Sequence, residues 1–129
     1  MNVDATGTVY PPVPFVVDPE RVAAFRAVFG IDEGVPPTFA TAAEFAVLPQ
    51  VLADPALGVD FTRVVHGWQE YAYLRPLREG ESLQAIPRVE SVRQKGGAGF
   101  MTLAIDLVDV DGRVVCTARS QMIERSADG

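Results

Sequence analysis

The chain has 129 residues, of which 48% are hydrophobic and 22% are charged, and this composition is typical of one globular domain. Its 17 acidic and 11 basic side chains give a net charge of −6, which repels the phosphate backbone of nucleic acids. One histidine and one cysteine are too few for a zinc or iron site within one chain, and a lone thiol makes no internal disulfide. We therefore expect no nucleic-acid partner, no metal and no other cofactor.

The beginning of the chain carries neither a basic segment nor an apolar segment of the kind found in leader peptides. No run of about 18 apolar residues occurs further along, so no membrane segment is predicted. We expect a cytoplasmic protein that forms a single domain over residues 1–129. Residues 1–13, which are rich in proline, are predicted to form an irregular tail of that domain.

Two helices are predicted after the tail. A capping residue at Asp18 and a glycine stop at Gly30 bound an amphipathic helix over about 19–29. A second helix begins near Thr41, and nearly all of its side chains are small or apolar, which is typical of a helix surrounded by protein. Pro49 is expected to break or offset this helix because proline lacks the backbone donor.

The rest of the chain has the pattern of long strands. Four runs are rich in β-branched and aromatic residues, at about 62–74, 82–94, 99–110 and 113–124. The Asp111-Gly112 pair predicts a hairpin between the last two runs, and Pro87 indicates an edge position or a bulge in the second. Helices followed by an antiparallel sheet predict an α+β domain. A long sheet curled around one apolar helix is the hot-dog fold, and this is the predicted architecture.

Two segments resemble the MaoC-like dehydratase N-terminal family. The first is the run of residues 64–83, VVHGWQEYAYLRPLREGESL, and the second is the Pro-Pro-Thr-Phe run at 36–39. The likeness covers roughly residues 15–125. It implies a hot-dog fold, dimerisation by edge-to-edge joining of two sheets, and binding of an acyl chain carried on coenzyme A or acyl carrier protein. It also implies a reaction, the reversible dehydration of a 3-hydroxyacyl thioester.

One part of the family pattern is missing from this chain. The resemblance implies an Asp-x4-His dyad on a loop after the first helix, but only five residues, 31–35, separate Gly30 from Pro36, and none is histidine. The predicted function is therefore an acyl-thioester-binding hot-dog subunit, related to (3R)-hydroxyacyl-CoA/ACP dehydratases but without its own hydratase motif. It would form a homodimer, or a heterodimer with another hot-dog subunit. A non-enzymatic structural or assembly subunit is the alternative from a different class.

A third hypothesis is a hot-dog acyl-CoA thioesterase in which Glu44 and His66 are the catalytic residues. Glu44 lies on the most apolar helix, where its carboxylate either reaches solvent or lies beside a pocket with a raised pKa. His66 either forms a hydrogen bond with backbone near the dimer seam or contacts substrate. Thr38 or Thr41, at the start of the helix, would polarise the thioester, and Thr38 is also a candidate substrate-binding residue.

Three further candidates for substrate binding lie on or after the first long strand. Gly67 would allow close approach of backbone or ligand, and Gln69 follows it on the same strand. Arg75 either binds a phosphate of the carrier or forms a salt bridge with a nearby acid. Strict alternation along the strand predicts that His66 shares one face with Trp68, while Gly67 and Gln69 share the other.

Overall fold

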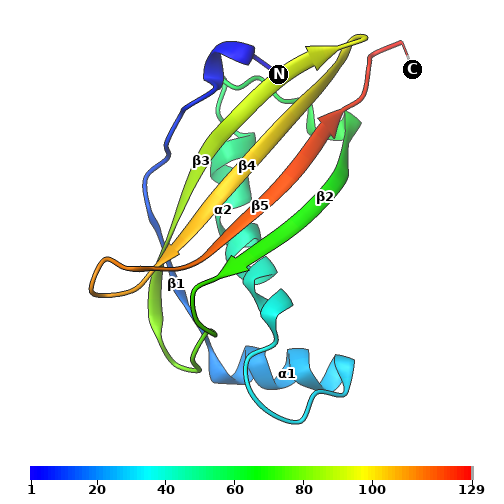
Figure 1. The fold of residues 1–129 in the computed structure, drawn as a ribbon. Coiled ribbons are helices and arrows are strands. Elements are labelled where there is room, and N and C mark those ends of the chain that lie inside the picture. The colour runs from blue at the N-terminus through cyan, green and yellow to red at the C-terminus, as the bar shows by residue number, and fades with distance from the viewer. Residues whose placement is uncertain (129) are drawn as a thin grey trace.

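The structure is a computed structural model that describes residues 1–128. Five antiparallel strands form one sheet in the spatial order β1-β3-β4-β5-β2, and α2 runs along one face of this sheet (Figure 1). The strands are β1 (Val13–Val16), β2 (Val64–Tyr73), β3 (Ser82–Lys95), β4 (Ala98–Val108) and β5 (Val114–Glu124). The helices are α1 (Pro19–Phe29) and α2 (Thr41–Leu52), with short 3-10 turns η1 (Val3–Ala5), η2 (Pro37–Ala40) and η3 (Phe61–Arg63). The predicted α+β hot-dog arrangement is confirmed.

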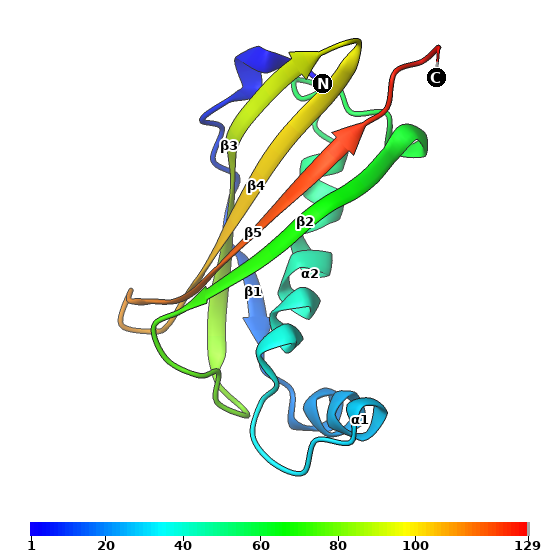
Figure 2. The same ribbon diagram turned by 45° about the vertical axis from the view of Figure 1, so that its right-hand side comes forward.

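Helix α1 has the boundaries that its capping residues predict. The Asp18 side chain accepts a hydrogen bond from the backbone N–H of Glu20 at 3.1 Å, and Gly30 ends the helix in the left-handed conformation, with φ of 65°. The helix lies at one end of the molecule, beyond the start of α2 (Figure 2).

The predicted break at Pro49 is wrong, because α2 continues through this residue to Leu52. Proline removes one donor and crowds the carbonyl of Phe45 one turn earlier. Val47 and Val51, on either side of Pro49, are completely buried, whereas Pro49 itself lies on the exposed side of the helix. Burial of the apolar side of α2 therefore outweighs the local cost of the proline.

The core lies between α2 and the inner face of the sheet. Completely buried side chains on β4 include Met101, Leu103 and Leu107, and partly exposed residues alternate with them except at Ala104, which is also buried. Phe39 of η2 packs edge-on against Phe25 of α1, with ring centroids 5.6 Å apart. This aromatic contact attaches α1 to the rest of the domain.

The two hairpins differ in the length of their turns. Gly96 and Gly97 join β3 to β4 with φ of 59° and 80°, the backbone that a two-residue turn requires. The hairpin predicted at Asp111-Gly112 is present, but β4 ends earlier, at Val108. The loop is closed by the N–H of Asp109, which donates to the carbonyl of Arg113 at 2.9 Å.

The first twelve residues run along the outer edge of β3. The N–H of Gly7 donates to the carbonyl of Val89 at 2.8 Å, and the N–H of Tyr10 donates to the carbonyl of Pro87 at 2.9 Å. Beside Pro87 the edge of β3 is thus covered by this segment rather than by β1, so the proline interrupts no strand pairing there.

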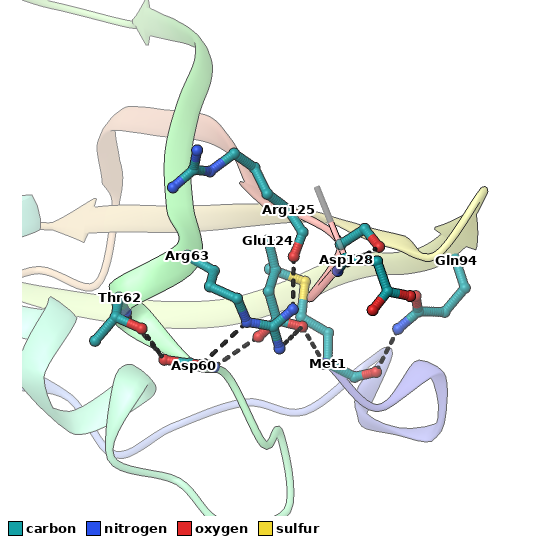
Figure 3. Close-up of polar contacts among 9 residues, drawn as sticks. Met1, Asp60, Thr62, Arg63, Gln94, Glu124, Arg125 and Asp128 are labelled. Atoms are coloured by element: carbon teal, nitrogen blue, oxygen red, sulfur yellow. Dashed lines mark hydrogen bonds and ion pairs between the residues drawn. The ribbon is translucent and has the colours of Figure 1, made fainter.

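Glu124, at the end of β5, connects three separate segments (Figure 3). Its carboxylate accepts hydrogen bonds from the Met1 ammonium at 3.0 Å and from the backbone N–H of Asp60 at 2.6 Å. Arg63 lies 3.9 Å away, and only 6% of Glu124 is exposed. Burial would raise the pKa of this carboxyl group, but the hydrogen bonds and the neighbouring positive charges hold it below its usual value.

Among residues 1–128, no helix has the length and apolar content needed to cross a lipid bilayer.

Candidate active site

A buried carboxylate on the central helix is the main chemical feature of the inner face. Glu44 of α2 is only 6% exposed. Its Oε1 accepts hydrogen bonds from the Gln69 amide at 2.9 Å and from the Tyr71 hydroxyl at 2.8 Å, both on β2. The Tyr71 hydroxyl is in turn hydrogen-bonded to the Thr41 hydroxyl at the start of α2. Glu44 Oε2 accepts no hydrogen bond from the described residues, so one carboxylate oxygen remains available.

The surroundings of Glu44 favour its protonated form. Burial raises the pKa of Glu44 above its usual value, and the hydrogen bonds from Tyr71 and Gln69 and the charge of His66 oppose this rise only partly. Burial also raises the pKa of the Tyr71 phenol, which therefore remains a hydrogen-bond donor. Of the two alternatives for Glu44, the structure supports the raised pKa rather than a carboxylate that reaches solvent.

A β-bulge determines which way His66 faces. His66 pairs with Met122 of β5, but Trp68 pairs with Gln121, so Gly67 is an extra residue in β2. Directly paired residues share a face of the sheet, and Met122 is buried on the inner face. The prediction that His66 shares a face with Trp68 is wrong, because the bulge reverses the alternation between them.

The inner face of β2 therefore brings His66 to the same side as Gln69 and Tyr71, facing α2. The His66 charge acts on the Glu44 carboxyl group, as the pKa of Glu44 reflects. The Nε2 of His66 lies 3.0 Å from the backbone carbonyl of Trp68, and because a carbonyl only accepts, Nε2 must carry the proton. This bond spans the bulge and leaves Nδ1 on the side of the ring away from the Trp68 carbonyl.

The other candidate residues fall in different places. Thr38 is exposed on η2, and it is Thr41 that joins the hydrogen-bonded group around Glu44. A Cβ on Gly67 would lie 2.6 Å from Gln121 Oε1 and 3.2 Å from Ile123 Cδ1, so a side chain here would have to displace the ends of these two β5 side chains. Gln69 lies in the group and donates to Glu44.

Arg75 forms the salt bridge that was one of its two expected roles. Its guanidinium donates to both carboxylate oxygens of Glu81, at 2.7 and 3.0 Å, and lies 3.8 Å from Asp109. A cation held by two acids is a poor candidate for direct contact with phosphate. It is well placed to hold the two loops that carry these acids.

Sequence reasoning missed two members of the inner-face group. Tyr71 could have been found, because it lies two residues after Gln69 and so shares its face. Ser120 had no signal in the sequence. It pairs with Gln69, and its hydroxyl is buried with no hydrogen-bond partner in the described part of the chain. No group of three or more histidine, cysteine or acidic side chains suited to a metal ion occurs among residues 1–128.

Comparison with known families agrees with this architecture. Residues 5–118 match the family described as "FAS1-like, dehydratase domain region". This chain belongs to that family. The predicted relationship to MaoC-like hot-dog dehydratases is thereby confirmed. The matched residues cover β1 to β4 and the first part of β5, up to residue 118.

The relatives of this chain include two UPF0336 proteins. The one from Saccharopolyspora erythraea is 37% identical over 108 residues, which cover 84% of this chain and 67% of the relative. The one from Streptomyces avermitilis is 38% identical over 117 residues, which cover 91% of this chain and 76% of the relative.

Two solved structures have the same fold at low sequence identity. One is a chain of the C-terminally truncated HadBC (3R-hydroxyacyl-ACP dehydratase) complex from Mycobacterium tuberculosis, with a TM-score of 0.80, 20% identity, and coverage of 95% of this chain and 99% of that chain. The other is a MaoC-like dehydratase with a TM-score of 0.79 and 20% identity, of which this chain spans 43%. These likenesses establish the hot-dog fold of the FAS1-like dehydratase region.

Proposed function

We propose that this protein binds acyl thioesters as one hot-dog subunit of a dimer and has no hydratase dyad of its own. The short connection between α1 and η2 carries this proposal. Residues 31–36 join the two elements directly and contain no histidine, and the only histidine of the chain lies on β2. A subunit of this kind would supply a binding surface, while the acid and base of the dehydration come from a partner subunit.

The free edge of β2 supports a dimer. β2 is the last strand of the sheet, and its other edge pairs with no strand of the described residues. Two apolar side chains on its outward side, Val65 and Trp68, are 42% and 41% exposed. An exposed edge of ten residues with apolar side chains pairs readily with a second strand. The HadBC neighbour, whose chain has the same fold, is described as a complex, and this agrees with the proposal.

Two measurements test the proposal with the purified full chain. We expect the isolated protein to bind a non-hydrolysable acyl-CoA thioether in calorimetry, and to hydrate an enoyl-CoA only after a hot-dog subunit with an Asp-x4-His motif is added. Hydration by the isolated chain at the rate of a complete hydratase would overturn the subunit role. Absence of binding to any thioester, alone or with the partner, would leave only an assembly role.

The dimer is tested by its mass in solution. A lysine at Trp68 places a charge on the pairing edge, so Trp68→Lys should shift the protein from dimer to monomer in light scattering. Val9→Lys is the matched control, because Val9 is 63% exposed and lies beside β3 at the opposite edge of the sheet. Equal masses for wild type and Trp68→Lys would contradict pairing through β2.

A second candidate function, thioester hydrolysis, is favoured by Glu44 itself. A carboxyl group with a raised pKa is a stronger base than an ordinary glutamate, and its free Oε2 can accept a proton. Glu44 would take a proton from water as the water oxygen bonds to the thioester carbonyl carbon. The C–S bond would then break, and the proton would pass to the departing thiolate. Release of free thiol from acyl-CoA that is lost in Glu44→Gln would establish this activity, and no release would exclude it.

A further inference from the structure

Arg75 connects two loops at one end of the sheet. It lies just after β2 and binds Glu81, next to the start of β3, with hydrogen bonds of 2.7 and 3.0 Å. It also lies 3.8 Å from Asp109, which follows β4 in the hairpin to β5. Both loops lie at the end of the sheet where the β2 arrow finishes (Figure 2). One guanidinium and two carboxylates thus fix the β2–β3 loop relative to the β4–β5 hairpin.

The same two carboxylates also fix the backbone of two more arginines. Glu81 accepts the backbone N–H of Arg78 at 2.5 Å, and Asp109 accepts the backbone N–H of Arg113 at 3.0 Å. These acids are therefore occupied by Arg75 and by backbone donors. The side chains of Arg78 and Arg113 form no ion pair within residues 1–128.

The two arginines line one cleft in a protein that is acidic overall. The cleft has a volume of about 600 Å³ and lies between the β2–β3 loop and the β4–β5 hairpin. Its charged lining residues are three arginines, Arg75, Arg78 and Arg113, and two acids, Asp109 and Asp111. Asp109 forms an ion pair with Arg75, whereas Asp111 forms no ion pair within the described residues. With a net charge of −6 on the whole chain, two unpaired guanidinium groups in one cleft mark a place suited to an anion.

An apolar pocket adjoins this cleft. Leu74 and Arg75 line both, and the second pocket has a volume of about 380 Å³. Its other lining residues are Val35, Pro37, Tyr73, Pro76 and Leu77. Tyr73 donates a hydrogen bond to the carbonyl of Pro37, which leads toward the start of α2. A ligand with an uncharged arm and one anionic group would match the two pockets together.

We propose that Arg78 and Arg113 bind the phosphate of a phosphopantetheine thioester, with the pantetheine arm in the apolar pocket beside Leu74. The inference rests on the proposed binding of acyl thioesters and assigns the place of their carrier. Guanidinium groups match phosphate in geometry as well as charge, because their planar N–H donors can bind two phosphate oxygens at once. Arg75 is a positioning residue that holds the two loops at the correct separation. Coenzyme A and acyl carrier protein both carry this phosphate, so both fit the site.

Three ligands separate the contributions of the arm, the phosphate and the nucleotide. Calorimetry or fluorescence titration would measure affinities for an acyl-pantetheine, the matching acyl-phosphopantetheine and the matching acyl-CoA, all as non-hydrolysable thioethers. A single charge pair at about 4 Å in water contributes about 1 kcal/mol, or about fivefold in affinity. We expect Arg78→Gln and Arg113→Gln each to weaken acyl-phosphopantetheine binding about fivefold while leaving acyl-pantetheine binding unchanged. Asp111→Asn should strengthen it, because an opposing carboxylate is removed.

The outcomes distinguish failure of the phosphate site from failure of thioester binding, on which the site rests. Arg93→Gln is the matched control, because Arg93 is an exposed arginine near the far end of β3. If wild type binds the phosphorylated and unphosphorylated thioethers equally, or if Arg93→Gln weakens binding as much as Arg78→Gln, the phosphate site is wrong while thioester binding stands. If neither thioether binds, both proposals fall. An acyl-CoA that binds no more tightly than acyl-phosphopantetheine would favour carrier protein over coenzyme A as the source.

Discussion

Removing the Tyr71 hydroxyl tests the electrostatics of the inner face directly. Tyr71 donates to Glu44 Oε1 at 2.8 Å, so Tyr71→Phe deletes one of the two hydrogen bonds that stabilise the ionised carboxylate. A hydrogen bond to a charged group contributes about 1.5–3 kcal/mol, and a neutral one contributes about 0.5–1.5 kcal/mol. The cost of Tyr71→Phe should therefore be about 1 kcal/mol when Glu44 is protonated and about 2 kcal/mol when it is ionised.

The sign of the pH dependence follows from the raised pKa of Glu44. Glu44 ionises at its usual pKa in the unfolded chain and at a higher pH in the folded protein. The contribution of Glu44 to the free energy of unfolding is therefore greatest below the usual pKa and falls as the pH rises through the pKa of the folded protein. Tyr71→Phe raises the folded pKa further, because a donor to the charged form is lost. The difference between wild type and Tyr71→Phe should therefore increase with pH.

Urea unfolding at a series of pH values, with a fixed protein concentration, measures this difference. Tyr73→Phe is the matched control on the same strand, since the Tyr73 hydroxyl donates to the neutral carbonyl of Pro37 and its loss should have a constant cost. In a Glu44→Gln background, Tyr71→Phe should cost the smaller, pH-independent amount. A cost for Tyr71→Phe that is the same at every pH, or that stays pH-dependent without Glu44, would refute this account of the site.

Two further predictions concern the fold. Glu124→Gln should lower the free energy of unfolding near neutral pH. Because the pKa of Glu124 is lowered in the folded protein, the stabilisation by its carboxylate is present above the usual glutamate pKa and is lost as the pH falls through the pKa of the folded protein. The urea unfolding curves of wild type and variant should therefore converge in acid. Persistence of the gap in acid would assign it to packing instead. Pro49→Ala restores a backbone donor at an exposed position of α2, and thermal unfolding should show that the free energy of unfolding rises by about 2 kcal/mol. This is less than the full difference of about 3 kcal/mol between proline and alanine inside a helix, because proline also restricts the unfolded chain. A loss of stability on this change would mean that the proline ring itself packs usefully.

Local signals predicted the elements of the fold well. Asp18 and Gly30 set the bounds of α1, because a helix cap acts within a few residues of the chain. The alternation of large apolar side chains from Met101 to Leu107 predicted the buried face of β4, because this pattern is also set by residues close together in the sequence. Pro49 misled because its effect competes with the burial of α2 against the sheet, and that burial depends on contacts far away in the sequence.

The candidate site was predicted only in part, because it is made by contacts between distant segments. Glu44 stood out as a charge on an apolar helix, and Gln69 was identified on its strand. Their hydrogen bond joins residues 25 positions apart, so no local pattern could show that they meet. The role of Arg75 was left open between a phosphate and an acid, and the choice depended on how the loop carrying Glu81 folds back toward it.

The extra residue at Gly67 determines which face of β2 the residues before it occupy, and the type of residue at any one position does not show this. Upstream of it, Val64 and His66 face inward, and downstream Gln69 and Tyr71 do, so the count of residues between histidine and tyrosine decides whether both reach the same helix. Loss of one residue here would turn the imidazole to the outside while leaving every other side chain of the group in place. Among relatives, an insertion or deletion at this position is therefore as informative about the site as a substitution of His66 itself.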